Sequence, residues 1–261
     1  RSGGTRNAAL VAQAQGTSTD ARQRSSAMPD RLQWDPLPAT AAEGESVKAI
    51  TGGKLLLQQQ ATAEAVKRTA APKLLHLASH AFYLPNQKEE QPGGASKPQL
   101  LASSQGVVRT RNLQGESALL RSGIALAGAN QPNADPNDDG YLTALEVAQL
   151  DWEGTELVVI SACESGLGDL QVGEGVYGLK RAIAVAGARS SLLTLWKVDD
   201  DATRLFMESF YQRLKQGEGK AAALAATQKE FRESPELSAY SHPYYWAAFQ
   251  LSGDGGPIEG L

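Results

Sequence analysis

The chain carries a series of short apolar runs separated by stretches with helical spacing of their apolar residues. The runs at residues 73–80 and 157–160 are nearly continuous and have the length of strands buried on both faces. Shorter runs at 54–57, 190–196 and 246–251 predict further strands. Residues 119–126 are also expected to be extended.

Helices are predicted between these strands, at residues 43–50, 61–69, 202–214 and 221–231. A further helix is expected from residue 173, because apolar side chains recur at helical spacing up to Gly187, which ends it. Strands that alternate with helices of this length indicate an α/β fold with a mainly parallel sheet and helices on both faces.

The composition along the chain suggests three segments. Residues 1–33 are rich in small and polar side chains and poor in large apolar ones, so they are interpreted as a flexible N-terminal arm or linker. Residues 34–253 form the folded domain, and 254–261 form a C-terminal tail. Residues 85–114 contain prolines, glycines and scattered charges and predict an unusually long loop.

The overall composition narrows the classes of partner. The net charge of −4 and the lack of a basic stripe argue against a nucleic-acid groove, and no apolar run is long enough to span a membrane. A single cysteine excludes an internal disulfide and favours a reducing compartment, so we expect a cytoplasmic protein. Because the chain starts at Arg1 without a methionine, we expect a processed product or a piece of something longer.

Two predicted strands end in residues that can carry out nucleophilic catalysis. Cys163 follows the run 157–160 and precedes a glycine-rich turn, and His80 ends the run 73–80. A thiol needs a nearby imidazole to raise its thiolate fraction and to protonate the leaving amine. His76 shares the strand face of His80 but is expected to be a buried, hydrogen-bonded core residue, and His242 is expected to interact locally.

Several segments together strongly resemble one family, the CHAT family of caspase-like cysteine peptidases of the clan CD type. The resemblance covers about residues 37–253. The segments that carry it are 119–129, 139–144, 157–168, 173–176, 186–189, 195–200 and 242–249.

This resemblance implies a caspase-like three-layer sandwich that hydrolyses peptide bonds in protein or peptide substrates, with His80 and Cys163 as the catalytic dyad. It also implies an oxyanion hole formed by the backbone amides of Ala81 and Cys163. Members commonly follow helical repeats or other sensor domains, so upstream domains of this kind are expected partners. The family usually has glycine after the histidine, and Ala81 would be strained there if the position required a positive φ.

Two residues are candidates for substrate binding. In caspase-like relatives the position of Ser161 helps to line the S1 pocket, where an acid favours a basic P1 residue, but a serine supplies no charge. The acidic run 199–201 could supply this charge and favour lysine or arginine at P1, and Asp199 is the member to test first. The alternative for this run is capping of the helix that follows and a favourable interaction with its dipole.

An acidic segment matches the calcium-loop pattern through Asp135, Asn137, Asp139 and Glu146. The alternative is a capping box, in which Thr143 and Glu146 satisfy the start of a helix without metal. No other cofactor is expected.

The sequence therefore predicts a cysteine endopeptidase that is activated by a partner domain or signal. The alternatives are a catalytically silent caspase-like domain that binds or regulates a partner, and a calcium-sensing module.

Overall fold

The computed structural model describes residues 7–11, 34–35, 37–83, 102–103, 106–107, 118–131, 139–164 and 172–261. The strands are β1 (Asn7–Val11), β2 (Lys54–Leu56), β3 (Leu74–Tyr83), β4 (Ala102–Ser103), β5 (Gly106–Val107), β6 (Ser122–Ala125), β7 (Tyr141–Thr143), β8 (Leu157–Glu164), β9 (Ser190–Thr194) and β10 (Phe249–Gly253). The helices are α1 (Pro38–Thr51), α2 (Ala63–Lys67), α3 (Ala118–Arg121), α4 (Ala144–Val147), α5 (Val172–Val185), α6 (Asp200–Lys215), α7 (Lys220–Glu233) and α8 (Pro243–Trp246). Two 3-10 turns, η1 (Gln58–Gln60) and η2 (Pro235–Tyr240), complete the elements of these residues.

Eight of the strands form one mixed sheet. Its main path has the order β10-β9-β8-β3-β1-β2, and β6 pairs with the end of β3 and then with β7. Neighbours from β2 through β1, β3 and β8 to β9 run parallel. The pairings of β10 with β9, β6 with β3 and β7 with β6 are antiparallel. The predicted α/β class is confirmed, with a sheet that is parallel at its centre and mixed overall.

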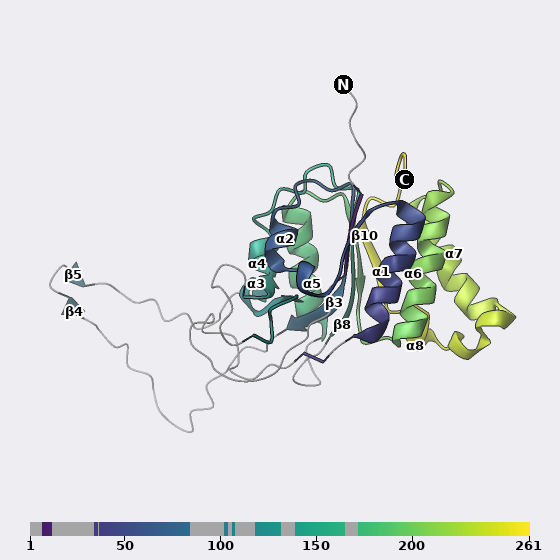
Figure 1. Ribbon diagram of the computed structural model, residues 1–261, viewed down its shortest axis with the longest axis horizontal. Coiled ribbons are helices and arrows are strands. Elements are labelled where there is room, and N and C mark those ends of the chain that lie inside the picture. The colour runs from purple at the N-terminus through teal and green to yellow at the C-terminus, as the bar shows by residue number, and fades with distance from the viewer. Residues whose placement is uncertain are drawn as a thin grey trace.

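Helices lie on both sides of this sheet. Figure 1 shows α1, α6 and α7 on one side and α2, α4 and α5 on the other. Leu157 and Val159 of β8 pack into the core under α1, α6 and α7, whereas Val158 and Ile160 pack into the core under α2, α4 and α5. Because side chains alternate between the faces of a strand, one continuous apolar run serves both cores. None of the helices in the described ranges is long and apolar enough to cross a membrane.

Strand β1 corrects the prediction of a flexible arm over residues 1–33. Asn7–Val11 lies between β2 and β3 and pairs in parallel with both, so the prediction is wrong for these residues. The segment Ala-Ala-Leu-Val was overlooked because the apolar content was averaged over the whole arm. These few residues suffice for a strand of ordinary length.

Two other segments differ from the prediction. Ala118–Arg121 is a helical turn rather than part of an extended segment, and the strand begins only at Ser122. Pro243–Trp246 forms α8, so the last strand begins at Phe249 and not at residue 246. Proline favours the first turn of a helix because its fixed φ suits that position. The predicted loop 85–114 lies outside the described residues, apart from the short β4–β5 pair.

The residues of the candidate site lie at one edge of the sheet. The parallel strands β3, β8 and β9 all end there, and α1 and α6 begin there, at Pro38 and Asp200. Figure 1 shows the first turns of α1 and α6 next to each other at this edge. Side chains at the strand ends and in these first turns therefore come together in space, as in other open α/β sheets.

Candidate active site

The backbone places His80 and Cys163 on adjacent strands. In the parallel pairing of β3 with β8, these two residues are partners in register. Neighbouring strands lie about 4.8 Å apart, so the two positions are as close as separate strands allow. The structure thus brings together the two residues that the sequence singles out as a dyad.

The segment that leads into α1 holds the His80 ring. Nε2 of His80 lies 2.7 Å from the main-chain oxygen of Asp35, and the Trp34 ring centroid lies 5.3 Å from that of His80. A carbonyl oxygen only accepts hydrogen bonds, so Nε2 carries the proton. The other nitrogen, Nδ1, is buried and has no hydrogen-bond partner among the described residues. Neutral His80 therefore keeps a lone pair on Nδ1 that can accept a proton.

His80 is only 6% exposed, and this burial favours its neutral form. Loss of solvation lowers the pKa of His80 below its ordinary value, and the positive charge of Lys197 acts in the same direction. The hydrogen bond and charge of Asp35 and the charge of Asp200 raise the pKa but do not offset the loss of solvation. At neutral pH the ring is therefore a base rather than an acid.

Ala81, which follows His80, has an ordinary extended backbone within β3. In the described part of the chain, the non-glycine residues with positive φ are Gln58 and Ala71. Ala81 therefore does not carry the strain that a left-handed conformation would impose. The role of the Ala81 and Cys163 amides as oxyanion donors stays a prediction.

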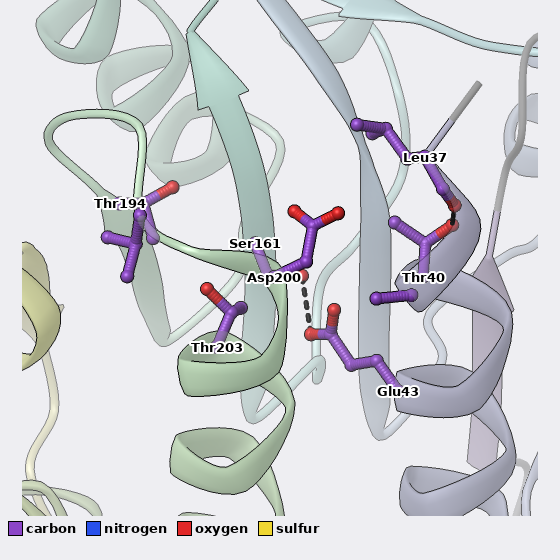
Figure 2. A pocket seen from close by; sticks show the side chains of 9 residues that line it. Leu37, Thr40, Glu43, Ser161, Thr194, Asp200 and Thr203 are labelled. Carbon is purple, nitrogen blue, oxygen red and sulfur yellow. Dashed lines mark hydrogen bonds between the residues drawn. The ribbon is translucent and has the colours of Figure 1, made fainter. Parts of the chain in front are cut away.

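A narrow pocket opens between the first turns of α1 and α6, beside the end of β8. It is lined by Leu37, Thr40, Glu43, Ser161, Thr194, Asp200 and Thr203, together with Ala39 and Val198. Figure 2 shows the side chains of Glu43 and Asp200 pointing into this space from opposite helices. We call it the acidic pocket. Ser161 lines this pocket, and its role in substrate binding stays a prediction.

The carboxylate of Glu43 is almost completely buried beside Ser161 and is held by a small network. Oε1 of Glu43 accepts a hydrogen bond from Oγ of Ser161 at 2.6 Å and lies 3.0 Å from Nε2 of His76. Nδ1 of His76 lies 2.9 Å from the Tyr211 hydroxyl. Burial raises the pKa of Tyr211, as does the charge of Glu43, so its hydroxyl keeps its proton. His76 is thus the buried, hydrogen-bonded core residue that the sequence predicted.

The acid that reaches the pocket is Asp200 rather than Asp199. Asp199 is the N-cap of α6, where its carboxylate accepts a hydrogen bond from the Ala202 amide at 3.1 Å. Asp200 lines the pocket, and partial burial raises its pKa, with the charges of Asp199 and Glu43 acting in the same direction. The predicted capping is confirmed for Asp199, and its proposed role in substrate binding stays untested.

The predicted calcium loop is described only in part, because Asp135 and Asn137 lie outside the described residues. Glu146 takes part in a complete capping box with Thr143, and its other oxygen lies 2.7 Å from the Lys67 ammonium. Oδ1 of Asp139 accepts a hydrogen bond from the Tyr141 amide. A calcium ion bound through Glu146 would have to displace Lys67. Among the described residues, no group of three or more His, Cys, Asp or Glu side chains could hold a metal ion.

The remaining histidine, His242, acts locally, as predicted: its Nδ1 accepts a hydrogen bond from the Tyr244 amide at the start of α8.

Three residues of the site were missed by sequence reasoning: Trp34, Asp35 and Glu43. Asp200 belongs to the acidic run 199–201 that the sequence singled out, but Asp199 was the member put forward for substrate binding. Asp35 acts through its main chain, which no side-chain pattern reveals. Glu43 did leave a signal, because Thr40, Glu43 and Val47 occupy one buried helical stripe. A glutamate in such a stripe indicates a buried acid with specific partners.

Comparisons with known proteins show curated relatives that are much longer than this chain. Human tetratricopeptide repeat protein 28 is 30% identical over 229 residues, which cover 87% of this chain and 9% of that protein. Tetratricopeptide repeat protein 28 of the mouse is 28% identical over 233 residues, again 87% of this chain and 9% of that protein. The chain therefore spans about a tenth of the length of these relatives.

Among solved structures, gingipain R, an Arg-specific cysteine proteinase, matches with a TM-score of 0.46 and 8% identity, covering 96% of this chain and 46% of that one. Protein GSU0716 from Geobacter sulfurreducens matches with a TM-score of 0.42 and 14% identity, covering 97% of this chain and 94% of that one. Likenesses of this size support no inference about the site.

The family comparison is decisive. The model of the CHAT domain matches residues 1–254, which is almost the whole chain and includes β1. The protein belongs to the CHAT domain family.

Proposed function

We propose that this CHAT domain is a cysteine endopeptidase in which Cys163 is the nucleophile and His80 the general base and acid. The observation that carries the proposal is the register of β3 and β8, which pairs these two residues, together with Nδ1 of His80, for which the described part of the chain offers no hydrogen-bond partner. The caspase-like three-layer interpretation of the fold belongs to the same proposal. It is supported by the order of the central strands and by the helices on both sides of the sheet.

The reaction would proceed in two stages, formation of a thioester and its hydrolysis. His80 takes the thiol proton of Cys163, and the thiolate attacks the scissile carbonyl carbon. The negative charge that develops on the carbonyl oxygen is stabilised by the amides of Ala81 and Cys163. The C–N bond breaks as His80 returns the proton to the leaving amine, which leaves a thioester. Water activated by His80 then attacks the thioester, and the C–S bond breaks to release the acid and the thiol.

Asp35 would act as a positioning residue for this cycle. Its carbonyl oxygen accepts a hydrogen bond from Nε2–H of His80, at an N···O distance of 2.7 Å, and so leaves Nδ1 to take and return the proton of the reaction. When His80 becomes an imidazolium, both nitrogens are donors, and Asp35 continues to accept from one of them.

The wider context of the chain is part of the proposal. The named relatives are tetratricopeptide repeat proteins, which fits a catalytic domain that works with upstream repeat domains in a longer polypeptide. We further propose that the protein works in the cytoplasm on protein substrates, where a lone thiol stays reduced.

A cleavage assay tests the proposal. The chain, alone and within the full-length polypeptide that carries it, is incubated with a peptide library, and new termini are identified by mass spectrometry. We expect cleavage by the native protein and none by Cys163→Ala or His80→Gln. An absence of new termini in every setting would instead favour the alternative, a silent domain that binds or regulates a partner.

A further inference from the structure

The main chain of Trp34 is fixed by the side chain of Asn130, which lies in the turn after β6. Nδ2 of Asn130 donates a hydrogen bond to the Trp34 carbonyl at 2.8 Å, and Oδ1 accepts one from the Trp34 amide at 3.0 Å. An asparagine carries a donor and an acceptor side by side, which this double contact requires. We call these two hydrogen bonds the Asn130 clamp.

The indole ring of Trp34 is also held in place. Its Nε1 donates a hydrogen bond to the Tyr141 hydroxyl at 3.1 Å, and that hydroxyl donates to the Ala129 carbonyl at 3.1 Å. The Trp34 side chain is buried, and its ring lies near those of Phe82 and Tyr141, at centroid distances of 6.0 and 6.4 Å. The fixed indole ring therefore forms one wall of the space in which the His80 ring lies.

The turn after β6 is itself attached to the strands around His80. Ala125, the last residue of β6, is the register partner of His80 in β3. The next amide, of Leu126, donates a hydrogen bond to the Gly140 carbonyl just before β7, at 2.7 Å. Gly140 has a φ of +80°, and a Cβ at this position would lie 1.9 Å from the Ala129 nitrogen. The turn and β7 can approach this closely only because residue 140 is a glycine.

These contacts form a closed path that begins and ends at His80. The path crosses from β3 to β6 and follows the turn to Asn130, whose side chain contacts Trp34. Asp35 follows Trp34 directly, and its carbonyl accepts the hydrogen bond from Nε2 of His80 at 2.7 Å. The position of that carbonyl therefore depends on how the main chain of Trp34 is held.

We infer that Asn130 is a positioning residue for the dyad, and that it acts through Trp34 and Asp35 to keep the proton of neutral His80 on Nε2. This inference rests on the proposed function, since it concerns the base of the same reaction. Without the Asn130 clamp the Asp35 carbonyl can move away, and the tautomer with the proton on Nδ1 becomes populated. In that tautomer Nδ1 has no lone pair with which to take the thiol proton. A shift of about 1 Å in a catalytic group can also cost about a hundredfold in rate.

The tautomer of His80 is the first test, because it can be measured without catalysis. Nitrogen NMR of protein with labelled histidines distinguishes a ring nitrogen that carries a proton from one that carries a lone pair. We expect the proton on Nε2 in the native protein, and a mixture of the two tautomers in Asn130→Ala. The nearly isosteric Asn130→Asp should give the same mixture, because it places an acceptor against the Trp34 carbonyl.

Ser209→Ala is the matched control for a general loss of stability. It removes a hydrogen bond of 2.6 Å to Glu230, which joins α6 to α7, and it should leave the tautomer unchanged. The native tautomer in both variants of Asn130, each of them folded, would overturn the inference. The same mixture of tautomers in Ser209→Ala would overturn it as well, because the effect would not be specific to the Asn130 clamp.

Alkylation of Cys163 is the second test and separates the two proposals. The probe is iodoacetamide, which needs no peptide-binding site. We expect Asn130→Asp to react about tenfold more slowly than the native protein and Ser209→Ala to react at the native rate, because the base loses both its tautomer and its orientation only in the first. A changed tautomer with an unchanged rate would support the Asn130 clamp and contradict the proposed dyad. An unchanged tautomer with rapid, His80-dependent alkylation would overturn the Asn130 clamp and support the dyad.

Discussion

His80 and Cys163 are partners in register on two adjacent parallel strands, and the main-chain carbonyl of Asp35 accepts a hydrogen bond from Nε2 of His80. This relationship follows from two buried strands of different sequence that end at one edge of the sheet. Both residues lie within regular strands, so their proximity does not depend on the conformation of a loop. Substitutions of residues that contact His80 should therefore change its pKa without moving the backbone of His80 and Cys163.

The first prediction separates the two contributions of Asp35. Asp35→Asn keeps the carbonyl acceptor but removes the negative charge that raises the pKa of His80. We expect the pKa of His80 to fall further, which an NMR titration can follow, because the chain has only three histidines to assign. A pKa that rises or stays constant would mean that the Asp35 charge does not act on the ring.

The second prediction concerns stability and pH. Because burial lowers the pKa of His80 in the folded state, protonation of this ring favours the unfolded chain. Above about pH 6.5 the ring is neutral in both states and contributes nothing. As the pH falls below that value towards the lower folded pKa, the free energy of unfolding should decrease.

Urea unfolding at several pH values would measure this effect. The difference between the native protein and His80→Gln should change over that pH window and be constant above it. A difference that is independent of pH throughout would contradict the assignment.

The third prediction concerns the buried carboxylate beneath the acidic pocket. Glu43→Ala leaves Ser161 and His76 without their shared acceptor, and a buried donor that loses its partner costs about 1 to 3 kcal/mol of unfolding free energy. Glu45→Ala, at an exposed position of the same helix, should change it by less than about 0.5 kcal/mol. Similar values for the two variants would show that the network contributes nothing specific.

The fourth prediction concerns the capping box of α4. Thr143→Ala should cost about 1 kcal/mol, because the Glu146 amide loses its acceptor. Calcium should leave the melting temperature unchanged, since Glu146 is engaged by Thr143 and Lys67. A calcium-dependent rise that is lost in Asp139→Ala would instead support the metal site.

The strands that carry the dyad could be predicted because each is a continuous apolar run, and burial on both faces permits no polar alternation. The ends of these runs pointed to His80 and Cys163. β1 was missed because its short apolar segment is surrounded by polar residues, so its place depends on the edges of β2 and β3.

The residues that surround the dyad were harder to predict from the sequence. Asp35 contacts His80, and Glu43 contacts His76 and Ser161, only because α1 and the residues before it pack on the sheet. The choice between Asp199 and Asp200 depends on where α6 begins, because one residue of helix changes which carboxylate caps and which lines the pocket. Such a boundary cannot be placed to one residue from a run of three identical acids.

The most direct measurement of the central claim is the rate at which a peptidyl chloromethyl ketone alkylates Cys163, which is the only cysteine of the chain and so the only thiol to label. If His80 is its base, the native protein should react about a hundredfold or more faster than His80→Gln, with one label per chain. Equal rates in the two proteins, with both folded, would contradict the dyad.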